Sequence, residues 1–189
     1  MTLAFLAGTI LPALLTFLGL IGGSLLVDWL LHAADLAEFG RWLGPLGVGL
    51  LALSFLYSLR RRKVITAGSP KALLAWHETL GWLGALVLLV HGGIHLNAVV
   101  PWLALAAMVV VVASGLTGKV LLAEARKQLA GRRRELEEQG MGPGECERRL
   151  LTMALLTGTM QRWRSIHMPL TMAFAALALV HVAVTLLLW

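Results

Sequence analysis

Charged side chains are scarce in this chain of 189 residues: Asp, Glu, Lys and Arg make up 14% of it, against 58% hydrophobic residues. Soluble globular domains have about 25% charged residues, so the composition excludes that class. The mean hydropathy of +0.80 instead predicts an integral membrane protein. A chain of 20.4 kDa has room for one bundle of about four to six spanning helices. It leaves no room for a separate nucleotide-binding or catalytic domain outside the lipid.

Cysteine is almost absent as well, because Cys146 is the only one. A single cysteine excludes an internal disulfide framework and every metal motif that needs several cysteines. Iron–sulfur clusters are held by cysteine thiolates, so we expect none within this chain. The net charge of +6 does not indicate nucleic-acid binding, because basic residues of membrane proteins gather in cytoplasmic loops. We therefore expect no nucleic-acid partner.

Uncharged runs long enough to cross about 30 Å of hydrocarbon, at about 1.5 Å per residue, recur along the chain. The run 79–118 is too long for one span, and Asn97 and Pro101 suit a turn that divides it. The sequence therefore predicts an all-α integral membrane bundle with five transmembrane helices, forming a single membrane domain, residues 1–189. The expected spans are approximately residues 3–27, 42–59, 72–96, 101–122 and 165–189.

A polar segment, residues 123–164, separates the fourth span from the fifth. Ala123–Gln139 is typical of helix that continues out of the fourth span, and Gly140–Gly144 (GMGPG) breaks it. Apolar residues return at helical spacing in Glu145–Trp163. The segment is thus expected to form a cytoplasmic helical hairpin. Two roles stay open for it, namely a linker that contacts lipid headgroups and a docking platform for a partner subunit.

The basic residues predict how the chain is oriented. Fifteen of the sixteen fall in the loops between spans two and three and between spans four and five, and Arg41 alone lies on the other side. The positive-inside rule places loops rich in Lys and Arg in the cytoplasm. We therefore expect a bacterial cytoplasmic membrane protein with its N-terminus in the cytoplasm and Trp189 outside.

Histidine is concentrated in two of the expected spans. Five of the six histidines belong to spans three and five, namely His77, His91, His95, His167 and His181. An ionisable residue within a transmembrane helix costs about 3 kcal/mol, and by default it indicates a functional site. A single histidine of this kind could be a packing residue. Five in two helices favour a shared function.

The spacing of four of these histidines repeats. His77 and His91 are fourteen residues apart, and so are His167 and His181. Fourteen residues make about four helical turns, with a rise of about 21 Å and side chains about 40° apart around the axis. Spans three and five run in the same direction, because one helix separates them. We therefore predict two facing imidazole pairs, His77 with His167 near the cytoplasm and His91 with His181 near the outside.

Two imidazoles about 4 Å apart, nitrogen to nitrogen, could bind one metal ion between them. Zinc sites normally have three or four protein ligands, so two histidines per level are too few for zinc. A haem brings four equatorial nitrogens and needs only two axial ligands. The sequence therefore predicts two haem b groups, with His77, His167, His91 and His181 as the iron ligands.

The residue midway between the two histidines of each helix is a further candidate for contact with the cofactors. Gly84 lies midway between His77 and His91, where a missing side chain would let a macrocycle approach the backbone. Close helix packing is the alternative explanation for this glycine. Phe174 has the corresponding place on the fifth span, where it would fill the space between the two rings.

Polar residues near the membrane surfaces complete the candidate set. Lys71, Arg162 and Arg164 flank the inner pair and could bond haem propionates, although an ordinary basic flank is an equal alternative. His95 stands one turn beyond His91 and is an alternative outer ligand, propionate partner or proton relay. Glu78 is a candidate proton or quinone-site group.

The four paired histidines resemble those of membrane cytochromes b with two stacked b haems. Their placement on the third and fifth spans is most similar to the ferric-reductase-like transmembrane domain. Ferric reductases, NADPH oxidases and the haem-binding membrane subunit of the bacterial methionine sulfoxide reductase system share that domain. The spacing is also similar to cytochrome b of quinol:cytochrome c reductases. The resemblance covers roughly residues 72–189. The chain departs from it in having five expected spans, where many relatives have six or more, and no flavin and NADPH domain.

The function expected from these patterns is that of a dihaem cytochrome b electron-transfer subunit within a membrane oxidoreductase complex. It would pass electrons across the membrane between a quinone pool and a partner redox subunit, with no catalytic residue of its own. Two alternatives belong to other classes: a cofactor-free proton channel or transporter that uses the histidines, and a non-redox membrane anchor. A terminal reductase of metal ions or oxygen is a third, but two imidazoles per iron argue against an open axial position.

Overall fold

The structure, a computed structural model, describes residues 10–94, 99–151 and 164–188. These residues are almost entirely helical, and they contain no strand. Five helical segments among them are long and apolar enough to cross a membrane: Leu11–Ala33, Ala37–Arg61, Pro70–Gly93, Val99–Glu138 and Ile166–Leu188. The predicted all-α membrane bundle of five spans is therefore confirmed, and its apolar helices indicate a lipid bilayer as their surroundings.

Helix α2, Leu11–Ala33, extends past residue 27, where the sequence analysis ended the first span. Residues 28–33 contain no Gly or Pro, so nothing in the sequence stops the helix, and Asp28 lies within it. The helix ends next to Asp35, whose φ of 57° places that residue in the left-handed region. Residues 3–9 of the expected span lie outside the described residues.

The second span is broken near its end. It consists of a short 3₁₀ helix η2, Ala37–Phe39, then α3, Gly40–Ser54, and α4, Leu56–Arg61. At the break, the amide of Ser58 donates to the carbonyl of Phe55, three residues back, at 2.9 Å. This bond departs from the four-residue pattern of the α-helix.

Helix α5, Pro70–Ile94, provides the third span and begins with a side-chain cap. The Oγ of Ser69 accepts a hydrogen bond from the amide of Ala72 at 3.2 Å. Pro70 follows at the first helical position, where no backbone N–H is needed. Residues 95 and 96 of the expected span lie outside the described residues.

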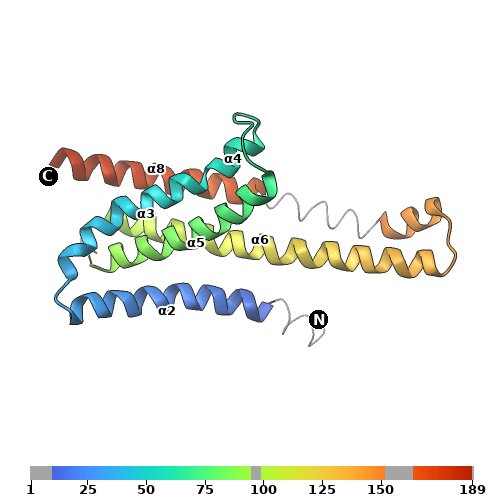
Figure 1. Cartoon of the computed structure of the whole chain (residues 1–189), viewed down its shortest axis with the longest axis horizontal. Helices are drawn as coiled ribbons and strands as arrows, with labels where there is room; N and C mark the ends of the chain where they lie inside the picture. The colour runs from blue at the N-terminus through green and yellow to red at the C-terminus, as the bar shows by residue number, and fades with distance from the viewer. Residues whose placement is uncertain (1–9, 95–98, 152–163, 189) are drawn as a thin grey trace.

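Helix α6, Val99–Glu138, has 40 residues and provides the fourth span. At about 1.5 Å per residue it is about 60 Å long, roughly twice the thickness of the hydrocarbon layer. Its second half therefore projects beyond the bundle, as Figure 1 shows. The prediction that helix continues out of the fourth span is confirmed.

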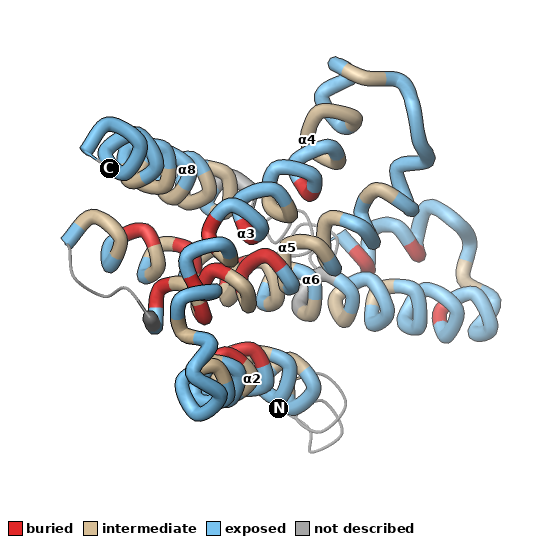
Figure 2. Tube along the Cα trace, turned by 60° about the vertical axis from the view of Figure 1, so that its left-hand side comes forward, coloured by how far each residue is buried: buried red, intermediate tan, exposed pale blue. Residues whose placement is uncertain are grey.

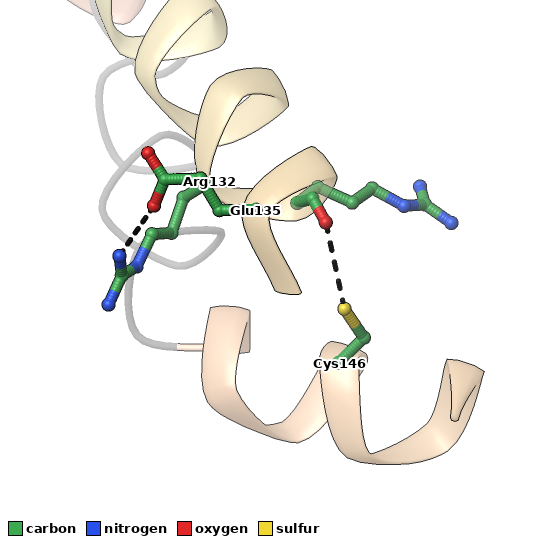
Figure 3. A network of polar contacts seen from close by, with 4 residues as sticks. Arg132, Glu135 and Cys146 are labelled. Carbon is green, nitrogen blue, oxygen red and sulfur yellow. Dashed lines mark hydrogen bonds and ion pairs between the residues drawn. The ribbon is translucent and has the colours of Figure 1, made fainter. Parts of the chain in front are cut away.

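The projecting half of α6 is one arm of a helical hairpin. Gly140, with a φ of 77°, ends the arm, and residues 143–151 are helical again. Leu136, Cys146 and Leu150 are buried together between the two arms. The Sγ of Cys146 lies 3.9 Å from the carbonyl oxygen of Arg133. Figure 3 shows Cys146 facing the projecting half of α6, beside the ion pair between Arg132 and Glu135. The helix, turn and helix of the predicted hairpin are confirmed as far as residue 151, whereas its cytoplasmic position stays a prediction. Residues 152–163 lie outside the described residues.

Helix α8, Arg164–Leu188, provides the fifth span and packs mainly against α6. Helix α5 packs mainly against α3, and it also contacts α2 and α6. The buried cluster consists of Leu20 from α2, Ala85 and Leu88 from α5 and Met108 from α6. Figure 2 shows the buried positions on those helices and α3, whereas α8 carries none. Helix α8 therefore lies at the side of the bundle, next to α6.

The two ends of the bundle differ in their basic residues. We call the end where α4 finishes and α5 and α8 begin the basic end, because it carries Arg60, Arg61, Arg62 and Lys63. The other end, where α2 and α8 finish, is called the far end. Helices α5 and α8 both run from the basic end to the far end (Figure 1), as the sequence analysis expected.

Candidate functional site

The histidines of α5 and α8 meet in two pairs, at the levels that the repeated spacing predicts. At the far end, the ring centroids of His91 and His181 are 6.5 Å apart, with their planes tilted by 51°. At the basic end, His167 lies near His77. The structure thus brings together all four histidines that the sequence analysis paired.

Both α5 histidines are anchored to the backbone of α3. The Nδ1 of His91 lies 2.8 Å from the carbonyl oxygen of Gly40, and the Nδ1 of His77 lies 3.1 Å from that of Ser54. A carbonyl oxygen can only accept, so in each bond Nδ1 carries the proton and donates it. The neutral imidazole then has its lone pair on Nε2. Gly40 and Ser54 are fourteen residues apart, the same separation as the two histidines.

The break between α3 and α4 supplies one of these carbonyls. In an uninterrupted α-helix, the amide of Ser58 would donate to the carbonyl of Ser54. Here that amide donates to Phe55 instead. The Ser54 carbonyl is therefore available to His77. The break between α3 and α4 thus exposes the backbone group that anchors this histidine.

His167 of α8 is anchored to a side chain on α6. The Oγ of Ser114 lies 2.6 Å from the Nδ1 of His167 and 2.9 Å from the carbonyl oxygen of Val111. A hydroxyl has one hydrogen, and Val111 can only accept it. The Nδ1 of His167 is therefore the donor in the bond to Ser114. Ser114 is buried, with 6% of its surface exposed, so this bond lies inside the bundle.

Helix α8 repeats a small motif around its two histidines. Thr171 and Thr185 each follow a histidine by four residues, and each hydroxyl donates to that histidine's carbonyl at 2.8 Å. The two threonines are again fourteen residues apart. The local backbone around His167 and His181 is therefore alike, although sequence analysis did not single out either threonine.

Gly84 lies where α3 and α5 touch. A Cβ on Gly84 would be 3.2 Å from the carbonyl oxygen of Gly47, and one on Gly47 would be 3.3 Å from the carbonyl oxygen of Gly84. The same Cβ on Gly84 would be 2.9 Å from the side chain of Leu51. This reciprocal contact supports the packing explanation of Gly84. Its assignment as a cofactor contact stays a prediction.

The other expected contact residues lie in different surroundings. Phe174 packs against the buried cluster, and its expected place between two rings stays a prediction. Lys71 is exposed near the start of α5, and Arg164 is the first residue of α8. Arg162 and His95 lie outside the described residues. The expected roles of these four polar residues stay predictions.

Two features at the basic end adjoin His77. The ring of Tyr57 lies 5.5 Å from that of His77, centroid to centroid, and the Tyr57 hydroxyl accepts a hydrogen bond from Arg61. Glu78 forms an ion pair with Lys119 of α6 at 2.5 Å, which joins α5 to α6 beside the level of His77 and His167. The pairing of Glu78 with Lys119 was not foreseen, because the two residues are 41 positions apart.

Two buried polar atoms have no hydrogen-bond partner among the described residues, the Oδ1 of Asp28 and the Nε1 of Trp82. Asp28 lies near the far-end histidine level. A Cβ on Gly93, two residues after His91, would be 3.2 Å from this carboxyl group. Placing a carboxyl group inside a transmembrane helix is costly unless it faces the bundle, as Asp28 does.

Residues other than the histidines offer few ligands for a metal ion. Among the described residues, no group of three or more His, Cys, Asp or Glu side chains could hold one. Among the described residues, each histidine level presents two imidazoles, and their use as axial ligands stays a prediction. What sequence analysis missed is their anchoring by Gly40, Ser54 and Ser114. Two of these act through the backbone, which every residue has, so no sequence signal distinguishes them.

Comparison of the chain with models of protein families, with curated proteins and with solved structures gives no match in any of the three.

Proposed function

We propose that the chain is a dihaem b-type cytochrome that carries electrons across the membrane. Its two haem b groups would be held by His77 with His167 at the basic end and by His91 with His181 at the far end. The observation that carries the proposal is the hydrogen bond that His77, His91 and His167 each make through Nδ1 to a neighbouring helix. His77, His91 and His167 all donate from Nδ1, so each has its lone pair on Nε2.

This arrangement is typical of metal-ligating histidines. Such a histidine almost always donates its second ring N–H to a carbonyl, a carboxylate or a water, which fixes the ring orientation and makes the ligating nitrogen more basic. In this chain the acceptors are carbonyls of α3 and a hydroxyl of α6. A packing histidine inside an apolar bundle also needs an acceptor for its N–H, so the support for a metal site is that the same ring nitrogen, Nδ1, makes this bond in all three histidines.

The spacing of the far-end pair also fits a metal between two imidazoles. An imidazole nitrogen binds a transition metal at about 2.0 Å, so two ligating nitrogens on opposite sides lie about 4 Å apart. Each ring centroid is about 1.2 Å beyond its nitrogen, which gives a centroid separation of about 6.4 Å. The observed separation of 6.5 Å between His91 and His181 agrees with this value.

Haem b supplies one-electron chemistry at its iron when bound. The protein would contribute the axial imidazoles, held in a fixed orientation by α3 and α6, and an apolar surrounding of low dielectric constant. Phe174 and the buried cluster would keep water out of the region between the two levels. Lys71, Arg162 and Arg164 are candidate partners for propionates at the basic end.

The proposed circuit needs partners at both ends. We propose a quinone as one of them and a redox subunit of a larger complex as the other, which agrees with a chain whose projecting hairpin offers a surface beyond the membrane. By the positive-inside rule, the basic end would face the cytoplasm. A reporter enzyme active only outside the cytoplasm, fused after Trp189, should then be active, whereas the same reporter inserted after Gly140 should be inactive.

Absorption spectroscopy of the purified protein tests the proposal. We expect a Soret band, and on reduction sharp bands typical of low-spin b haem. Substitution of His167 by Ala should remove the basic-end haem, and substitution of His181 by Ala the far-end haem. His32→Ala is the matched control, because His32 is exposed on α2 and belongs to neither pair.

The alternatives give different results in the same experiment. A colourless protein that still conducts protons in vesicles would support the channel or transporter. A colourless protein whose His167→Ala variant leaves the activity of the whole assembly intact would support a membrane anchor. Either result would overturn the proposal of a dihaem cytochrome.

A further inference from the structure

Helix α3 carries a glycine at the point where it meets the ring of His91. Gly44 is buried, one turn after the Gly40 carbonyl that accepts the proton of His91. A Cβ added to Gly44 would lie 2.9 Å from both Cε1 and Nε2 of this imidazole, and 3.3 Å from its Cδ2. Separations under 3.0 Å essentially never occur for real Cβ atoms, so the ring would have to move.

The ring cannot move freely, because its Nδ1 is held by the same helix, α3. Nδ1 donates to the carbonyl of Gly40 at 2.8 Å, and that carbonyl belongs to the backbone of α3 itself. A methyl group at position 44 would push the ring away from α3 while the hydrogen bond holds it there. The methyl would be equally close to Cε1 and to Nε2, and Nε2 is the nitrogen that the proposed function uses as a ligand.

We propose that Gly44 is a positioning residue for the far-end cofactor, because only glycine at this position lets α3 hold the His91 imidazole with Nε2 directed at His181. This inference rests on the proposed function for the identity of the ligand, but the contact between Gly44 and His91 is independent of it. Gly40 and Gly44 thus act together on His91. The Gly40 carbonyl accepts a hydrogen bond from Nδ1, and the missing side chain of Gly44 leaves room for the edge of the ring that contains Nε2.

Three other described glycines do not have this relationship to a histidine of either pair. Gly115 of α6 lies next to His167, but a Cβ there would be 3.6 Å from Cε1, an ordinary van der Waals contact. Gly47, on the same helix as Gly44, would meet Leu88 and the carbonyl of Gly84 and no histidine. Gly49 would meet nothing within 4 Å. Alanine substitutions at these three positions serve as controls, because the added methyl would meet a histidine loosely at Gly115, other groups at Gly47 and nothing at Gly49.

The test is a double-mutant cycle of Gly44→Ala with His91→Ala in the full-length chain. Haem per chain and the thermal midpoint of unfolding are measured for both single variants and the double variant. Gly44→Ala should lower the haem content from two per chain to about one, because it displaces one axial ligand. Gly115→Ala and Gly49→Ala should retain both haems.

The double variant decides whether Gly44 acts through His91. If it does, adding Gly44→Ala to His91→Ala should change neither the haem content nor the thermal midpoint, because the ring that the methyl would meet is gone. This comparison stays informative if Gly44→Ala alone fails to fold. Gly47→Ala should lower the thermal midpoint without selective loss of the far-end haem.

Two results would overturn the inference. One is a Gly44→Ala variant with the haem content and spectrum of the wild type. The other is a double variant that is less stable than His91→Ala by as much as Gly44→Ala is less stable than the wild type, which would mean that the methyl disturbs helix packing alone. A wild-type protein without haem would instead contradict the proposed function, and the thermal midpoints would still report on the contact.

Discussion

The carbonyl oxygen of Gly40 accepts a hydrogen bond from the Nδ1 of His91, across the interface between α3 and α5. The two atoms are 2.8 Å apart. The equivalent bond joins Ser54 to His77 at the basic end. Since both donors and both acceptors are fourteen residues apart, α3 repeats the period of α5 in the opposite direction. Helix α3 therefore sets the orientation of both α5 imidazoles.

Removing the hydroxyl of Ser114 should weaken cofactor binding at the basic end only. Ser114→Ala leaves the Nδ1 of His167 without the acceptor that now lies 2.6 Å away. Loss of such a partner typically lowers the affinity for the bound metal group about 10- to 100-fold. Retention of each haem during prolonged washing in detergent measures the effect. Ser114→Thr keeps the hydroxyl and should retain both haems, and equal loss from the alanine and threonine variants would contradict this role.

Gly84→Ala should destabilise the bundle whether or not a cofactor is bound. The added methyl would be 3.2 Å from the carbonyl oxygen of Gly47 and 2.9 Å from Leu51, so α3 and α5 would have to separate. We expect a loss of about 1–3 kcal/mol in the free energy of unfolding, as for other overpacked contacts. Denaturant titration in detergent, followed by circular dichroism, checks it.

Gly81→Ala is the control for that variant, because a Cβ at position 81 would meet nothing within 4 Å. It should be as stable as the wild type. A Gly84→Ala protein of unchanged stability that has lost haem would show that Gly84 serves the cofactor rather than the contact between helices.

The hairpin should unfold independently of the histidine levels. Leu136 is buried, with 3% of its surface exposed, against Cys146 and Leu150. Leu136→Ala should cost about 2–5 kcal/mol locally, as in other buried cavities. Faster amide hydrogen exchange in the projecting half of α6 would report this loss, with the absorption spectrum unchanged. Leu151→Ala, at a leucine that is 55% exposed, should leave the exchange rates as they are.

Much of this architecture could be predicted from the sequence, because hydropathy and spacing are properties of the chain itself. Uncharged runs located the five spans, and the fourteen-residue period predicted which histidines meet. The helix bounds were less accurate: α2 continues through Asp28, since a carboxyl group can stay in a span when it faces another helix.

The anchoring of the histidines could not be predicted. Gly40 and Ser54 act through carbonyl groups that every residue possesses, and Ser114 is selected by how α6 packs on α8. Gly84 was predicted to face a cofactor, with helix packing as the alternative, and the structure places it against α3. Each of these contacts depends on which helices are neighbours. The periodicity of a single helix does not show which helices are neighbours, so the contacts could not be predicted.

The number of haems per chain tests the central claim most directly. A pyridine haemochrome assay on the purified full-length protein, combined with amino-acid analysis, gives this ratio without any assumption about electron donors. Two imidazole pairs predict two haem b per chain, falling to one in the His181→Ala variant. A wild-type protein that contains no haem after expression with haem supplied in excess would contradict the account.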